Sequence, residues 1–170
     1  MSYSSELTNA MKWLGERDNT VFLGQSVLYP GNAIFKTLCN VPDDKKIEMP
    51  VAEEMQLGMS IGMAMAGKIP ITIFPRMDFL MCCMNQLVNH LDKKLYPGKV
   101  IIRTFVGSKE PLNPGVQHCG DYTEVMESLL KDVHVIKLPN SMNIMPAYIG
   151  AFSGKGSYLM IEYGDSYGME

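Results

Sequence analysis

Two adjacent carboxylates, Glu53 and Glu54, lie at the start of a segment that is predicted to be helical from Ala52 to Gly67. A carboxyl group in the first turn of a helix interacts favourably with the helix dipole, and it can also serve as a general acid or base. The residues alone favour the dipole role. The other group suited to proton transfer is His118, near the end of an irregular stretch over residues 107–120, because an imidazole changes charge near neutral pH.

The four cysteines indicate neither a metal site nor a disulfide framework. They form no Cys-X-X-Cys pair and no zinc-ligand spacing, so we expect free thiols and no metal site. Two of them lie in the apolar run from Phe79 to Met84 and are predicted to be buried. The four are Cys39, Cys82, Cys83 and Cys119.

The chain of 170 residues suits one domain with a substantial core, since 46% of the residues are hydrophobic and 19% are charged. Its 15 basic and 18 acidic residues give a net charge of −3. This argues against nucleic-acid binding, because no basic surplus neutralises phosphates. No apolar stretch approaches ~18 residues, so no membrane span is expected, and the first residues lack the apolar core of a signal peptide. We therefore expect a soluble, cytoplasmic protein.

Apolar strand-like runs alternate with helical patterns along the whole chain. Such alternation predicts an α/β fold, with a parallel sheet of five or six strands and helices on both faces. In such sheets ligands bind at the carboxyl ends of the strands, and the loop over residues 107–120 leaves such an end. The predicted strands are 20–23, 46–49, 69–74, 99–105, 133–138 and 158–161, and the predicted helices are 6–14, 33–38, 52–67, 78–96, 122–131 and 141–152, the last with Ser141 as its N-cap.

A stripe of small residues runs along the predicted helix over residues 52–67. Gly58, Gly62 and Ala66 are spaced by four and therefore share one helical face. Each glycine inside a helix costs about 1 kcal/mol relative to alanine, which indicates a very close neighbour on this face. Two neighbours remain open: the protein's own sheet, or a helix of another subunit.

Several segments together resemble the pyrimidine-binding domain of thiamine diphosphate-dependent enzymes. The centre of the resemblance is Pro50-Val-Ala-Glu53, followed by Gly58, Gly62 and Met65-Ala-Gly67. The chain is most similar to the beta subunit of the decarboxylating component of 2-oxoacid dehydrogenase complexes, and transketolase has a related domain. Further matching segments follow in the same order, between about Ser5 and Glu162: Val21-Phe-Leu-Gly24, Met77-Asp78-Phe79, Gln86 to His90, Ile102-Arg103-Thr104, Gln117-His118 and Pro139-Asn140.

The resemblance implies a role for each of four side chains. Glu53 takes the position of the catalytic carboxyl that hydrogen-bonds the pyrimidine ring nitrogen and shares a proton with it. Phe79 takes the position of the aromatic ring that stacks on the pyrimidine. His118 matches a catalytic histidine of the active-site channel. Gln25 stands where the family often has an acid that relays protons between two active sites. The resemblance therefore implies that Gln25 binds the cofactor but does not relay protons.

In this family the cofactor lies between two domains, and the second domain holds the diphosphate through a divalent metal. The resemblance therefore implies thiamine diphosphate as cofactor, with Mg2+ held by a diphosphate-binding alpha-type partner subunit, in a homodimer or heterotetramer. The chain is expected to be a single pyrimidine-binding domain over residues 1–170, without the family's C-terminal transketolase-type domain. Gly164-Asp165-Ser166 resembles the start of the metal-diphosphate motif, but the Asn that follows later in that motif has no counterpart before Glu170.

The implied function is that of the pyrimidine-binding subunit of a split enzyme with a small-molecule substrate. Two reactions fit the resemblance. One is decarboxylation and acyl transfer from a 2-oxoacid, which is an oxidoreductase reaction. The other is two-carbon transfer from a ketose, which is a transferase reaction. A non-catalytic interaction or regulatory protein that retains the fold is the alternative. The presence of Glu53, Phe79 and His118 together argues against that alternative.

Overall fold

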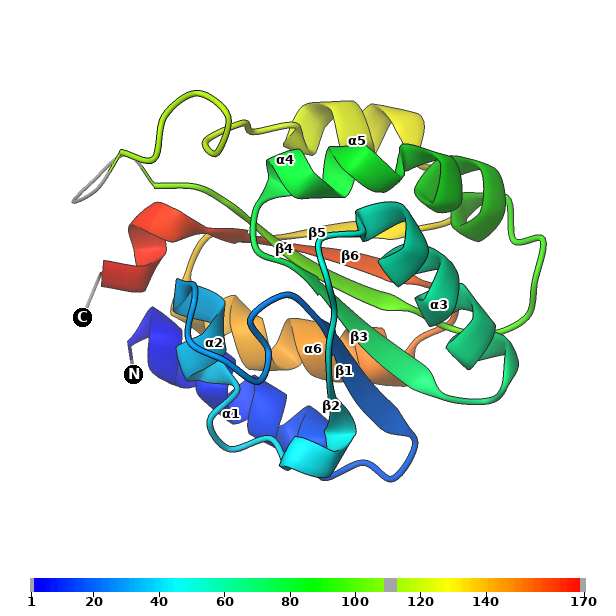
Figure 1. The fold of residues 1–170 in the computed structure, drawn as a ribbon, viewed down its shortest axis with the longest axis horizontal. Helices are drawn as coiled ribbons and strands as arrows, with labels where there is room; N and C mark the ends of the chain where they lie inside the picture. Colours follow the sequence, from blue (N-terminus) through cyan, green and yellow to red (C-terminus); the bar gives the residue numbers. More distant parts are fainter. Residues whose placement is uncertain (1, 109–112, 169–170) are drawn as a thin grey trace.

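The computed structural model describes residues 2–108 and 113–168. These residues form a six-stranded sheet in which all neighbouring strands are parallel, in the order β2-β1-β3-β4-β6-β5 (Figure 1). The predicted α/β fold with five or six parallel strands is confirmed. Within the same residues, no helix is long and apolar enough to cross a membrane. The strands are β1 (Thr20–Gly24), β2 (Lys46–Glu48), β3 (Ile69–Phe74), β4 (Ile101–Val106), β5 (His134–Leu138) and β6 (Tyr158–Tyr163).

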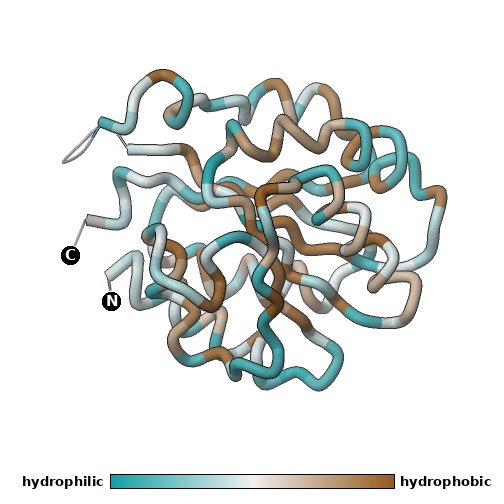
Figure 2. Tube along the Cα trace, in the orientation of Figure 1, coloured by the Kyte–Doolittle hydropathy of each residue, from teal (hydrophilic) through white to brown (hydrophobic). Residues whose placement is uncertain are grey.

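Helices cover both faces of the sheet, as predicted. Strand residues alternate between the two layers: Ile101 belongs to the core that includes α1 and α6, whereas Ile102 belongs to the core that includes α3 and the segment after α4. Both faces of the central strands are therefore apolar, which explains the long hydrophobic stretches of these strands in Figure 2. The helices of one face are α1 (Tyr3–Gly15), α2 (Ala33–Thr37) and α6 (Ile144–Ser153), and those of the other are α3 (Glu53–Met65), α4 (Met77–Leu80) and α5 (Thr123–Leu129).

The prediction of one continuous helix over residues 78–96 is wrong, both in the type of helix and in the residue at which the helix ends. The segment consists of α4, a 3-10 turn at Met81–Cys83 and a π-helix at Asn85–Asp92. At the end of the π-helix, the carboxylate of Asp92 accepts hydrogen bonds from the backbone N–H groups of residues 131–133, which follow α5. These bonds hold the end of the helix against that segment. Lys94 then adopts a left-handed conformation with a φ of 50°, which a right-handed helix does not contain.

Two smaller predictions also differ from the structure. Ser141 is not the N-cap of α6: it begins a 3-10 turn, Ser141–Asn143, and α6 starts at Ile144 without a side-chain cap. Cys82, expected to be buried, is exposed, because adjacent residues of a helical turn point in different directions. Its neighbour Cys83 is buried in the core as predicted, and this burial raises the pKa of the Cys83 thiol to about 12. All four cysteines are free.

At the carboxyl end of β1, the backbone of Gly24 packs directly against Ile73 of β3. A Cβ atom at Gly24, the last residue of β1, would lie 2.4 Å from the carbonyl oxygen of Ile73. Only glycine allows this approach, so β1 and β3 stay side by side up to the point where their following loops begin. The segments that follow these strands carry two of the predicted site residues, Gln25 after β1 and Phe79, of α4, after β3.

Candidate active site

Glu53 is the first residue of α3 and lies half-buried at the carboxyl edge of the sheet. Its Oε1 accepts a hydrogen bond of 3.0 Å from Nε2 of Gln25, which comes directly after β1. Two of the predicted site residues, 28 positions apart in the chain, are thus in direct contact. Among the described residues, the Glu53 carboxylate accepts no other hydrogen bond. Its second oxygen, Oε2, is therefore available to a ligand.

A second carboxylate, which the sequence does not mark, holds the loop that carries Gln25. Glu48, at the end of β2, accepts hydrogen bonds from the backbone N–H groups of Ser26 at 2.6 Å, Val27 at 2.9 Å and Leu28 at 2.8 Å. Ser26 has a left-handed φ of 57°, a conformation that a residue other than glycine keeps only with support from its surroundings. Glu48 provides this support and thereby positions Gln25.

Phe79 and His118 lie against each other, although they come from distant segments. Their ring centroids are 5.5 Å apart and their planes are nearly perpendicular, at 85°. Such an edge-to-face arrangement is favourable for aromatic pairs. Both side chains are half-buried and both line the same pocket, so part of each ring is available to a ligand.

The loop end that carries His118 is fixed from two sides. Asp78 accepts a hydrogen bond of 3.2 Å from the backbone N–H of Gly120 through Oδ2 and one of 3.4 Å from the hydroxyl of Tyr122 through Oδ1. At the other end of the loop, a Cβ atom at Gly107 would lie 2.0 Å from the carbonyl oxygen of His118. Glycine is therefore required at position 107 for the loop to pack this closely.

The four predicted residues line two adjoining hollows rather than one pocket. Gln25, Phe79 and His118 line a pocket of about 310 Å³. Glu53 lines a larger, open hollow of about 790 Å³. The hydrogen bond between Gln25 and Glu53 connects the two. The structure thus brings all four side chains to one edge of the sheet and pairs them two by two.

Glu54 lies on the surface. Its Oε1 accepts hydrogen bonds of 2.9 Å from Nδ2 of Asn85 and 3.2 Å from Nε2 of Gln86, both of the π-helix after α4. The two adjacent carboxylates therefore have separate partners: the side chain of Glu53 contacts the loop after β1, and that of Glu54 contacts the neighbouring helix. Glu54 is consequently a matched control for any substitution of Glu53.

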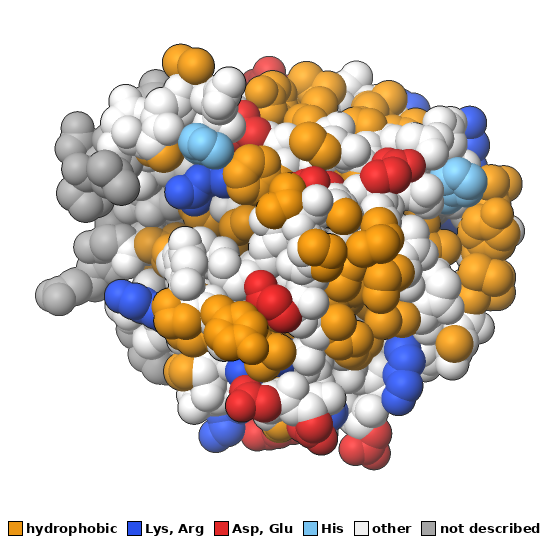
Figure 3. All heavy atoms as spheres, viewed as in Figure 1, with side chains coloured by type: hydrophobic (Ala, Val, Ile, Leu, Met, Phe, Trp, Pro, Cys, Tyr) orange, Lys and Arg blue, Asp and Glu red, His pale blue; other side chains and the backbone are white. Residues whose placement is uncertain are grey.

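The small-residue stripe on α3 faces away from the protein's own sheet. A Cβ atom at Gly62 would meet nothing within 4 Å, and one at Gly58 would make ordinary contacts with Gln86 from 3.6 Å. Gly62 and Ala66 are exposed. Tight packing of this stripe on the protein's own sheet is therefore wrong, and contact with another subunit stays a prediction. Apolar side chains gather over α3 in Figure 3, and the exposed ones of this helix include Met55, Met59 and Met65.

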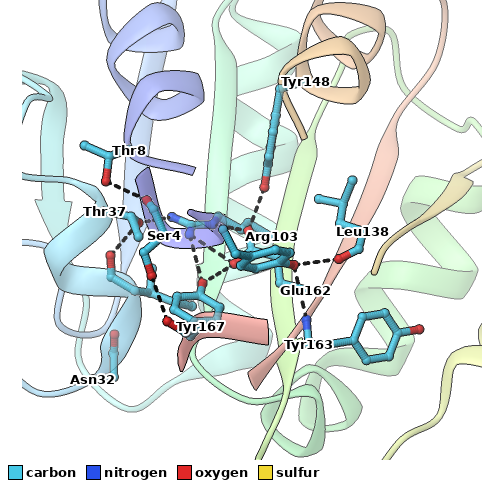
Figure 4. A network of polar contacts seen from close by, with 12 residues as sticks. Ser4, Thr8, Asn32, Thr37, Arg103, Leu138, Tyr148, Glu162, Tyr163 and Tyr167 are labelled. Atoms are coloured by element: carbon cyan, nitrogen blue, oxygen red, sulfur yellow. Dashed lines mark hydrogen bonds and ion pairs between the residues drawn. The ribbon is translucent and has the colours of Figure 1, made fainter. Parts of the chain in front are cut away.

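A fully buried ion pair joins β4 to β6. Arg103 of β4 and Glu162 of β6 have no exposed side-chain surface, and their Nε–Oε1 and Nη2–Oε2 distances are 2.5 and 3.0 Å (Figure 4). The hydroxyls of Tyr148, at 2.9 Å, and Tyr167 donate to the same carboxylate. Burial, followed by the charge of Glu162, raises the pKa of both tyrosines well above the ordinary value. Because Arg103 also donates to the hydroxyl of Thr37, the network joins β4 and β6 to α2, α6 and the last 3-10 turn.

Within residues 2–108 and 113–168, no three His, Cys, Asp or Glu side chains converge in a way that could hold a metal ion. The other two histidines lie against aromatic rings: His90 stacks on Tyr96, and His134 lies against Tyr158. Ser166, of the segment that resembles a metal-diphosphate motif, is buried and donates to the carbonyl of Pro139.

Residues 1–135 match the model of the family described as "Transketolase, pyrimidine binding domain". The chain belongs to this family. Among curated proteins, this pyrimidine-binding domain is similar to the 2-oxoisovalerate dehydrogenase subunit beta of Bacillus subtilis (strain 168), with 28% identity over 143 residues, 81% of this chain and 43% of that protein. It is also similar to the pyruvate dehydrogenase E1 component subunit beta of Cyanidium caldarium, with 27% identity over 123 residues, 71% of this chain and 38% of that protein.

The fold is also found in a solved structure described as a split gene transketolase, inactive beta4 tetramer. The match has a TM-score of 0.74 and 16% identity, and covers 96% of this chain and 51% of that chain. At this identity the likeness shows the fold alone. The pyrimidine-binding domain spans less than half the length of the two curated relatives.

Proposed function

We propose that this pyrimidine-binding domain, a single domain over residues 1–170, is one subunit of a thiamine diphosphate-dependent enzyme whose diphosphate-binding half lies on a partner chain. The family match over residues 1–135 supports this proposal. So do the names of two curated relatives, which are beta subunits of 2-oxoisovalerate and pyruvate dehydrogenases. On this basis the proposed substrate is a 2-oxoacid. A ketose is the second candidate, because the matching family model is described by the name of transketolase.

The observation that carries the proposal is the hydrogen bond between Gln25 and Glu53 at the edge of an open hollow. The amide of Gln25 engages one carboxylate oxygen, so the Glu53 side chain is already oriented and presents its other oxygen to a ligand. A carboxyl in this position suits a ring nitrogen with which it shares a proton. When bound, thiamine diphosphate supplies the carbanion chemistry, and Glu53 is proposed to hold the proton at its pyrimidine nitrogen.

The neighbouring aromatic pair supports the same assignment. Phe79 offers an apolar ring beside Gln25, which suits stacking with a pyrimidine. His118 lies against Phe79 in the same pocket and is proposed to donate or accept a proton at the substrate. A carboxyl, an aromatic ring and an imidazole at one edge of the sheet fit the ring end of the cofactor.

The diphosphate end is assigned to the partner. The described residues include no cluster of three metal-ligating side chains, so Mg2+ and the diphosphate are proposed to bind a diphosphate-binding alpha-type subunit. The exposed face of α3, with Gly62 and the neighbouring methionines, is the surface proposed to contact another subunit in a homodimer or heterotetramer.

Calorimetry with and without the partner tests the proposal. The chain is co-expressed with candidate chains that carry the metal-diphosphate motif, and thiamine diphosphate is titrated in the presence of Mg2+. We expect tight binding by the complex and weak binding by the chain alone, because the chain contacts one ring of the cofactor. As a control, the complex of the partner with the Glu54→Gln variant should bind thiamine diphosphate as tightly as the wild-type complex does. Sub-micromolar binding by the chain alone would contradict the split site, and no binding by any co-purified complex would contradict the function.

A further inference from the structure

One basic side chain enters the pocket that contains Phe79 and His118. Arg76 connects β3 to α4, and its side chain is half-buried. It lines the pocket of about 310 Å³ together with Gln25, Phe79 and His118. Arg76 lies outside the segments that carry the family resemblance, so the sequence predicts no role for it.

The guanidinium group of Arg76 is held in position but is not neutralised by the described residues. Its central carbon lies 4.4 Å from the centre of the Phe105 ring, a cation–π contact. Its Nη1 donates a hydrogen bond of 3.2 Å to the carbonyl of Pro75. Over residues 2–108 and 113–168, Arg76 takes part in none of the ion pairs. A guanidinium group has five N–H donors, so most of its donor capacity remains for a ligand.

The electrostatic surroundings agree with this geometry. Burial lowers the pKa of Arg76, while the nearby groups of Cys119 and Asp78 raise it in part. The carboxylate of Asp78 is already engaged by Gly120 and Tyr122. Arg76 is therefore a half-buried cation that has lost part of its hydration without gaining a close counter-ion from the described residues.

The contrast with Arg103 shows what such a group requires. Arg103 is fully buried, and two of its nitrogens bind the carboxylate of Glu162. A guanidinium group removed from water is stabilised by an anion that meets its planar fork with two oxygens. The described lining of the Arg76 pocket contains no carboxylate, so the place of the anion is open to a ligand.

We propose that Arg76 binds the anionic group of the substrate, a carboxylate or a phosphate, and thereby selects charged substrates. This inference rests on the proposed function, because it places the anionic end of the substrate beside Phe79 and His118. Both groups present paired oxygens that suit the guanidinium fork. The volume of about 310 Å³ is at the small end of ligand pockets, which suits a short substrate.

Binding of the anion is tested on the full chain by NMR of its 15N-labelled arginine side chains, with Arg76→Lys used for assignment. Pyruvate and ribose 5-phosphate are the charged probes, and methyl pyruvate and ribose are their neutral counterparts. We expect the Nε–Hε signal of Arg76 to shift saturably with one charged probe and not with its neutral counterpart. Which probe succeeds distinguishes a carboxylate from a phosphate. Arg17, which stacks on Trp13 and pairs with Glu16, is the internal control. Equal shifts at Arg17 and Arg76, or no shift, would overturn the proposal.

The same question is tested kinetically in the assembled enzyme. Arg76→Gln should raise KM for the charged substrate by about 10- to 100-fold relative to KM for its uncharged counterpart. The matched variant Arg17→Gln should leave this ratio unchanged. If Arg76→Gln leaves the ratio of the two KM values unchanged, the role proposed for Arg76 is refuted, but the proposed function is not. A wild-type assembly that exchanges no proton at the thiazolium carbon would refute the proposed function instead, and the NMR titration would then decide whether Arg76 binds anions.

Discussion

Replacing Glu162 by glutamine removes the negative half of the buried ion pair while keeping the shape of the side chain. Arg103 then remains charged and fully buried without a counter-ion, and the hydroxyls of Tyr148 and Tyr167 lose their charged acceptor. Removing one partner of such a pair costs about 3–5 kcal/mol, a large part of the total of about 5–15 kcal/mol that stabilises a typical domain. For a denaturant dependence of about 1–3 kcal/mol per molar urea, the unfolding midpoint should fall by at least about 1 M.

Urea unfolding followed by circular dichroism measures this effect. The control is Glu16→Gln, which removes an exposed carboxylate paired with Arg17 and should change stability by less than about 1 kcal/mol. Arg103→Met, Glu162→Met and the double variant complete a thermodynamic cycle. We expect the double variant to be more stable than the sum of the single effects predicts, because it leaves no unpaired buried charge. Additive effects, or a Glu162→Gln variant as stable as Glu16→Gln, would refute the reasoning.

Tyr148 and Tyr167, which bind the Glu162 carboxylate, have raised pKa values and so stay protonated in the folded state, whereas in the unfolded chain they ionise above about pH 10. The free energy of unfolding should therefore fall above about pH 10, by about 1.4 kcal/mol per pH unit for each tyrosine. Urea titrations should show a shallower fall for Tyr148→Phe but not for Tyr29→Phe, an exposed control; equal slopes would contradict this. Glu48→Gln loses the charged acceptor of three backbone N–H groups, so it should destabilise the chain by about 1–3 kcal/mol and weaken cofactor binding by the complex in calorimetry; wild-type values for both would show that Glu48 does not support the loop. By light scattering, the protein should be at least a dimer, and Gly62→Leu should weaken the assembly by about 1–3 kcal/mol while Gly150→Leu, a helical glycine that also faces open space, should not; a wild-type monomer with and without partner would exclude the α3 contact.

Much of the fold could be predicted from the sequence, because the central strands are buried on both faces. Segments such as Ile69–Phe74 and Ile101–Val106 read as nearly continuous apolar runs, and their alternation with helical patterns is typical of a parallel sheet. The details that were wrong depend on local backbone choices. Ser141 is a good N-cap residue by type, yet it begins a 3-10 turn, and the helical period does not distinguish an α-helix from the π-helix at Asn85–Asp92.

The site could be predicted only in part. The resemblance identified Gln25 and Glu53, and their contact follows from loops that leave the same edge of the sheet. Glu48 was missed, because it acts on backbone groups 20 to 22 residues earlier in the chain, and residue type alone does not reveal such contacts. Arg76 was missed for a related reason. Its significance lies in the lack of an ion pair within the described residues, which no sequence pattern encodes.

The proposed function depends most directly on the side chain of Glu53. Glu53→Gln keeps the shape and the hydrogen-bonding capacity of the side chain but removes the proton that it would share with the cofactor. In the assembled enzyme, the proton at the thiazolium carbon should therefore exchange with deuterium about 100- to 10,000-fold more slowly than in the wild type. Glu54→Gln, whose side chain contacts the neighbouring helix instead, should exchange at nearly the wild-type rate. Unchanged exchange in Glu53→Gln, or a loss of exchange in Glu54→Gln alone, would contradict the assignment of Glu53.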